Sequence, residues 1–76
     1  MSHDPAGRLV YMANQIGKAF LLRPQQEAVD ETAAHIKAFW EKRMLTRIFA
    51  HLDAGGAGLD EIPRLALLKV REALPK

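Results

Sequence analysis

The histidines and carboxylates are the side chains most able to support metal binding or acid–base chemistry. The three histidines are His3, His35 and His51, and no two of them have the i, i+4 spacing that places two metal ligands on one helix face. Acid–base catalysis would need a His or a carboxylate in an enclosed pocket that shifts its pKa. A chain of 76 residues offers little room for such a pocket. We therefore expect no metal site, no catalytic residue and no enzymatic activity from this chain alone.

A glycine-rich segment suggests two kinds of binding loop. A phosphate loop would follow a strand and carry Lys-Ser or Lys-Thr after its last glycine, and neither feature is present around Gly55, Gly56 and Gly58. Asp53 and Asp60 flank the glycines, but a calcium loop needs oxygen ligands at alternate positions, which here hold alanine and glycine. We therefore predict a structural turn, in which Gly55 and Gly56 supply the left-handed conformations that end a helix.

Four basic residues surround the single tryptophan: Lys37, Lys42, Arg43 and Arg47 lie on either side of Trp40. Such a cluster can bind nucleic acid, can be a solvated helix face over a buried tryptophan, or can contact a protein partner. The net charge of +2 is too small to indicate nucleic-acid binding by itself. We favour a solvated face with Trp40 in the core, and assign Arg43 to a partner contact because arginine is a frequent interface anchor.

The apolar pattern predicts an all-α fold, a small single-domain cluster of about four short helices in an antiparallel-like arrangement. Asp4 and Pro5 form a start signal for the first helix, and Pro24 ends it. Asp60 is expected to cap the fourth helix, where Pro63 is tolerated in the first turn. The helices are expected near residues 5–23, 25–40, 42–54 and 61–75.

Two of these helices carry more apolar surface than one core face requires. The expected core face of the first helix includes Ala19 and Phe20, and Phe39 lies beside that of the second. Other apolar residues point elsewhere, and a chain this small cannot cover two faces of two helices, so they predict a partner surface. These surplus residues are Val10, Gly17 and Leu21 in the first helix and Leu65 and Leu68 in the fourth.

Length and composition limit the class of protein. Residues 1–76 are long enough for one domain, with residues 1–4 expected as a flexible tail. The chain has no cysteine, which excludes disulfides and leaves helix packing or a partner to stabilise it. We find no apolar stretch long enough to cross a bilayer and no secretory signal pattern, so we expect no membrane association and a cytoplasmic location.

Three short segments point to a known family. They read Met-Ala-Asn-Gln-Ile-Gly over residues 12–17, Phe-Trp-Glu-Lys-Arg-Met over residues 39–44, and Gly-Gly-Ala-Gly-Leu over residues 55–59. In this order and spacing the chain resembles the small delta subunit of the cytoplasmic NAD-dependent, molybdenum-containing formate dehydrogenases. Lys42 stands where that family usually has proline, which leaves open whether a sharp break or a soft kink separates the second and third helices.

The resemblance implies a non-catalytic accessory subunit without a cofactor of its own. In the family's complex, molybdenum bis(guanine dinucleotide) belongs to the alpha subunit, and iron–sulfur clusters, FMN and NAD complete the electron path. The chain would support assembly, stability or cofactor loading of the alpha subunit, and would meet the beta and gamma subunits through it. The absence of cysteine agrees with a subunit that holds no cluster.

Two other functions remain open from the sequence: a free assembly chaperone for the same enzyme, and a small basic helical nucleic-acid-binding protein. We expect no nucleic acid as partner, because Asn14-Gln15 and the basic cluster lie on different helices. Trp40, Met44 and the three glycines are assigned to structural turns. The predicted contacts with the alpha subunit are Tyr11, Asn14, Gln15, Arg43, Leu65 and Leu68.

Overall fold

The computed structural model describes residues 5–74, and within them four helices and no strand are found. The helices are α1 (Pro5–Ala19), α2 (Gln25–Phe39), α3 (Lys42–Asp53) and α4 (Glu61–Ala73). The all-α prediction is therefore confirmed. Asp4, the expected cap of α1, and the expected tail 1–4 lie outside the described residues.

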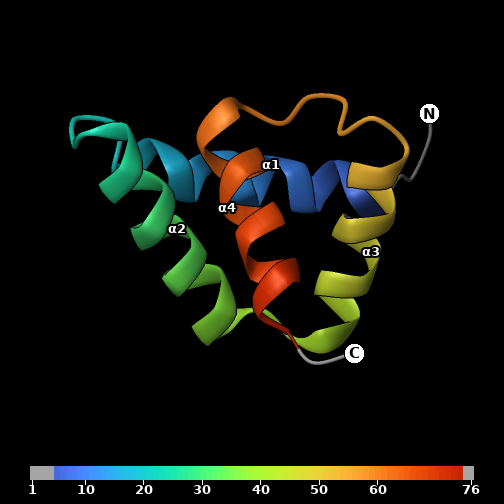
Figure 1. The fold of residues 1–76 in the computed structure, drawn as a ribbon. Helices are drawn as coiled ribbons and strands as arrows, with labels where there is room; N and C mark the ends of the chain where they lie inside the picture. Colours follow the sequence, from blue (N-terminus) through green and yellow to red (C-terminus); the bar gives the residue numbers. More distant parts are fainter. Residues whose placement is uncertain (1–4, 75–76) are drawn as a thin grey trace.

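The helices are arranged around α4 (Figure 1). α4 lies between α2 and α3, and α1 crosses behind it and contacts all three other helices. α2 and α4 run in the same general direction, and α3 runs opposite to both. Because α1 runs across its neighbours, the packing is less regular than the antiparallel arrangement that the short loops predict.

One continuous core joins the four helices. Its buried side chains come from every helix, and Ile36, Ile48 and Leu67 have no exposed surface. Small residues bring the backbones close: Ala13, Ala28 and Ala66 are also completely buried. The core therefore depends on close helix contacts as well as on large side chains.

The first helix is shorter than its apolar pattern predicts. After Ala19 the chain tightens into turns, in which the amides of Phe20 and Leu21 donate to the carbonyls of Gly17 and Lys18. The chain therefore leaves the helix axis before Arg23. Ala19 is exposed and Phe20 half-buried, so their expected place on the core face is wrong for Ala19 and only partly right for Phe20.

A sharp break separates α2 from α3. Trp40 (φ −90°, ψ 134°) and Glu41 (φ −75°, ψ 158°) are both extended, although Lys42 is not a helix breaker. The break turns the Trp40 side chain into the core, where it is 7% exposed. Phe39 points outward and is 71% exposed, so its expected place beside the core face is wrong.

The predicted glycines end α3 and begin the segment that leads to α4. Gly55 and Gly56 have φ values of +119° and +65°, and their amides donate to the carbonyls of Leu52 (3.0 Å) and His51 (2.8 Å). This pair of bonds is the Schellman ending of a helix. Asp60 stands at the N-cap of α4 as predicted, but its side chain makes no capping hydrogen bond.

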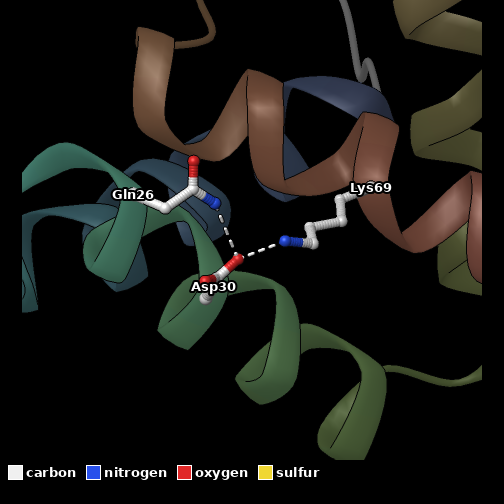
Figure 2. Close-up of polar contacts among 3 residues, drawn as sticks. All are labelled: Gln26, Asp30 and Lys69. Carbon is white, nitrogen blue, oxygen red and sulfur yellow. Dashed lines mark hydrogen bonds and ion pairs between the residues drawn. The ribbon is translucent and has the colours of Figure 1, made fainter.

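An ion pair joins α2 to α4 at the surface (Figure 2). Asp30 accepts hydrogen bonds from Lys69 and from Gln26 Nε2 (3.1 Å). The hydrogen bond from Lys69 lowers the pKa of Asp30 most, and the charge of Lys69 adds to this effect. On the opposite side of α4, Arg71 pairs with Asp53 of α3 at 2.7 Å.

Acid should weaken the contribution of Asp30 to stability. Because the pKa of Asp30 is lower in the folded chain, the pair stabilises the fold above the ordinary carboxyl pKa and is lost as the pH falls through the folded value. Urea unfolding experiments give the free energy of unfolding of the parent chain and of Asp30→Asn. The amount by which the parent is more stable should shrink between about pH 6 and pH 3. Glu31→Gln, which removes a neighbouring exposed carboxylate, is the control. If the parent is more stable than Asp30→Asn by the same amount across this range, the ion pair of Asp30 with Lys69 does not stabilise the fold.

Candidate interface surface

The predicted interface residues lie on three parts of the structure. Tyr11 and Gln15 lie on the exposed face of α1, and Asn14 lies at the edge of that face toward the α3–α4 segment. Arg43 lies at the start of α3. Leu65 and Leu68 of α4 are half-buried in a hollow that they share with α2. The structure does not bring these residues into one site.

Asn14 binds the chain itself. Its Nδ2 donates to the carbonyl of Gly58, and its Oδ1 accepts from the amide of Asp60, both at 2.9 Å. His51 holds the same segment from α3, because its Nε2 lies 2.7 Å from the carbonyl of Ala57 and donates to it. Asn14, a predicted partner contact, therefore also has a role in the fold, because its amide joins α1 to the segment before α4.

Alanine at Asn14 should destabilise the chain by about 1 kcal/mol, because both backbone groups lose their partner. Hydrogen exchange at the Asp60 amide should become faster. Gln15→Ala is the control, because Gln15 is exposed and binds only the Tyr11 hydroxyl (2.9 Å), so its loss should change stability by less than about 0.5 kcal/mol. Equal exchange rates at Asp60 in the parent and Asn14→Ala would contradict this role.

The apolar stripe on the far side of α1 is covered by the chain. A Cβ atom on Gly58 would lie 3.4 Å from Val10 Cγ1, and one on Gly17 would lie 2.9 Å from Pro63 Cδ. Val10 and Gly17 are therefore buried, and the prediction that they form a partner surface is wrong. The non-helical segment 54–60 and the first turn of α4 cover them, which helix periodicity alone does not reveal.

The exposed apolar side chains are found at the ends of helices. Leu21 and Leu22 follow α1 and are largely or fully exposed, and Phe39 ends α2. Phe39 stacks at a tilt on His35, with 4.7 Å between ring centroids. Tyr11, 64% exposed, is an exception, because it lies within α1. Of the surplus apolar residues predicted in the first helix, only Leu21 is exposed.

A groove lies between the first half of α1 and the start of α3. We call it the α1–α3 groove; its volume is about 390 Å³. Half-buried Met12 and Met44 and buried Leu9 provide its apolar surface. The remaining lining residues are charged: Arg8, Glu41, Arg43 and Arg47.

Sequence reasoning identified only part of this groove. The sequence points to Arg43, to Met44 and, through the basic cluster, to Arg47, but not to Arg8. Arg8 and Met12 have the i, i+4 spacing that places two side chains on one side of α1. That spacing, next to the inward Leu9, is the signal that identifies the α1 side of the groove.

Neither a metal site nor a membrane span is found in the part of the chain that the structure describes. In residues 5–74 no group of three or more His, Cys, Asp or Glu lies close enough together to hold a metal ion. None of the four helices there is long and apolar enough to cross a bilayer.

Comparison with known families identifies the chain. The family model of the NADH-dependent formate dehydrogenase delta subunit, FdsD, matches residues 8–67 of the 76 residues. No curated protein and no solved structure matches the chain significantly. The matched range runs from the first groove residue, Arg8, to the buried Leu67 of α4. The chain therefore belongs to the delta-subunit family of NADH-dependent formate dehydrogenases.

Proposed function

We propose that this chain is a non-catalytic accessory subunit of a cytoplasmic, NAD-dependent molybdenum formate dehydrogenase, which it joins by contact with the catalytic alpha subunit. The observation that carries the proposal is the family match over residues 8–67, since that family is described as the delta subunit of an NADH-dependent formate dehydrogenase. In this role the chain supports the assembly or stability of the alpha subunit, or its loading with the molybdenum cofactor. The beta and gamma subunits are reached through alpha.

The side chains available as metal ligands in this chain support the proposal that the cofactors of the enzyme belong to other subunits. Iron–sulfur clusters are held chiefly by cysteine thiolates, and the sequence contains no cysteine. We therefore propose that this chain binds neither cluster, flavin nor molybdenum cofactor, and that it acts through its surface alone.

The surface most suited to the partner includes the exposed face of α1 and the start of α3. Tyr11 and Gln15 present a phenol and an amide on α1, joined by a hydrogen bond of 2.9 Å. Tyrosine and arginine are frequent anchors in protein interfaces, and both Tyr11 and Arg43 are exposed. These three residues are proposed to take part in the contact, and Asn14, at the edge of the same face of α1, also binds the segment before α4.

Deletion of the gene in the native host tests the proposal. The formate dehydrogenase should then have lower activity, with a lower amount of alpha subunit or less molybdenum bound per alpha subunit. Re-expression of the chain should restore both quantities. Full activity and full molybdenum content in the deletion strain would contradict an accessory role.

Purification of the native complex separates a permanent subunit from an assembly chaperone. A tag on the alpha subunit should recover this chain in a stoichiometric amount from the mature, active enzyme. If it is recovered only with enzyme that lacks molybdenum, the chain is an assembly factor that leaves the finished complex.

A further inference from the structure

The start of α3 carries a concentration of positive charge. Lys42 and Arg43 are the first two residues of α3, Arg47 follows one turn later, and Arg8 faces them from α1 across the groove. Within residues 5–74 none of these four cations makes an ion pair or a side-chain hydrogen bond. By contrast, Lys69 and Arg71 on α4 are both paired with aspartates.

The position of these cations on the helix is electrostatically unfavourable. The amino end of a helix carries a partial positive charge, and acidic side chains usually occupy its first turn. The first turn of α3 has no acidic residue, and Glu41 is the one carboxylate that lines the groove. The excess positive charge therefore lies where the helix dipole repels it, and carboxylates supplied from outside would offset it.

The floor of the α1–α3 groove is apolar, whereas its rim is charged. Met12 and Met44 expose part of their side chains there, and the flexible thioether adapts to differently shaped apolar side chains. Nucleic acid is less well matched, because single-strand binding relies on aromatic side chains for base stacking and no aromatic residue lines the groove.

We propose that the α1–α3 groove binds a protein segment in which an apolar side chain is flanked by carboxylates. The apolar side chain lies against Met12 and Met44, and the carboxylates pair with Arg43 and Arg47 on the rim. This proposal rests on the proposed function, because the segment is assigned to the formate dehydrogenase alpha subunit. It adds the chemistry by which that subunit recognises this chain.

Charge reversal on the rim is the main test. Tagged chains carrying Arg43→Glu or Arg47→Glu would be added to formate dehydrogenase prepared from the deletion strain, and binding measured by titration. Each variant should bind about tenfold more weakly or worse, which corresponds to about 1.4 kcal/mol or more. Arg64→Glu, which makes the same charge change on an exposed site of α4, should bind as the parent does.

A second pair of variants tests the apolar floor. Met12→Gln keeps the length of the side chain but makes it polar, and should weaken binding severalfold at a temperature at which circular dichroism shows the variant to be fully folded. Leu22→Gln makes a similar change at a fully exposed residue outside the groove and should leave binding unchanged.

The outcomes separate the two proposals. If the parent binds the enzyme but Arg43→Glu and Arg47→Glu bind equally well, the groove proposal is wrong and the proposed function stands. If the parent itself does not bind, both are overturned. If a single-stranded oligonucleotide binds the parent and not the two arginine variants, the groove is a nucleic-acid site and the protein segment is excluded.

Discussion

Alanine at Trp40 should destabilise the chain by about 3–5 kcal/mol, because the indole is almost completely buried where α2 meets α3. A single core in a domain of this size supplies only about 3–5 kcal/mol of net stability. The variant should therefore be largely unfolded at room temperature. Far-UV circular dichroism during urea titration measures the loss, as a lower starting helical signal and an earlier midpoint.

Phe39→Ala is the matched control for this substitution. It removes the aromatic ring of the preceding residue, which is 71% exposed and stacks on His35. Its effect should stay within about 0.5 kcal/mol, as for most surface substitutions. A Trp40→Ala chain with the parent's midpoint would show that the indole does not hold the α2–α3 break in place.

Valine at Gly17 should have the second large effect. A Cβ atom at this position would lie 2.9 Å from Cδ of Pro63, and the ring of Pro63 is buried and rigid. Valine adds two further methyl groups, so α1 and α4 must move apart. Overpacking of this kind costs about 1–3 kcal/mol or more, which exceeds the gain of about 0.5 kcal/mol from replacing glycine in a helix.

The same substitution at Gly7 separates crowding from helix propensity. Gly7 is exposed in α1, so Gly7→Val should be neutral or slightly stabilising. In the double variant Gly17→Val/Pro63→Ala the two effects should be less than additive, because the smaller side chain makes room for the valine. Additive effects in urea unfolding would mean that the two residues do not meet.

The sequence predicts helices better than it predicts what covers them. Pro5, Pro24 and the paired glycines give the helix limits to within a few residues because each acts through its own backbone conformation. The break after Phe39 has no such local cause: it persists with Lys42 because Trp40 is drawn into the core. Its position depends on tertiary packing.

The candidate site shows the same limit. The helix pattern does not reveal the hydrogen bonds of Asn14, a predicted partner contact, because Gly58 and Asp60 belong to a segment without periodicity. The sequence predictions do not include Arg8, because its place in the groove with Arg43 depends on how α1 crosses the start of α3. Contacts between segments distant in sequence decide both roles; the i, i+4 spacing of Arg8 and Met12 gives one side of the groove but not the helix that lies across it.

The hydrogen bonds of Asn14 also bear on the order in which the chain folds during synthesis. They join residues 44 and 46 positions apart, and Gly17 packs on Pro63 across a similar separation. Such distant contacts form slowly, because a long loop must close first. The ribosome makes α1 before the residues that cover it, so Val10 and Gly17 stay uncovered until α4 has been translated. During that interval the first helix exposes an apolar face that the finished fold hides.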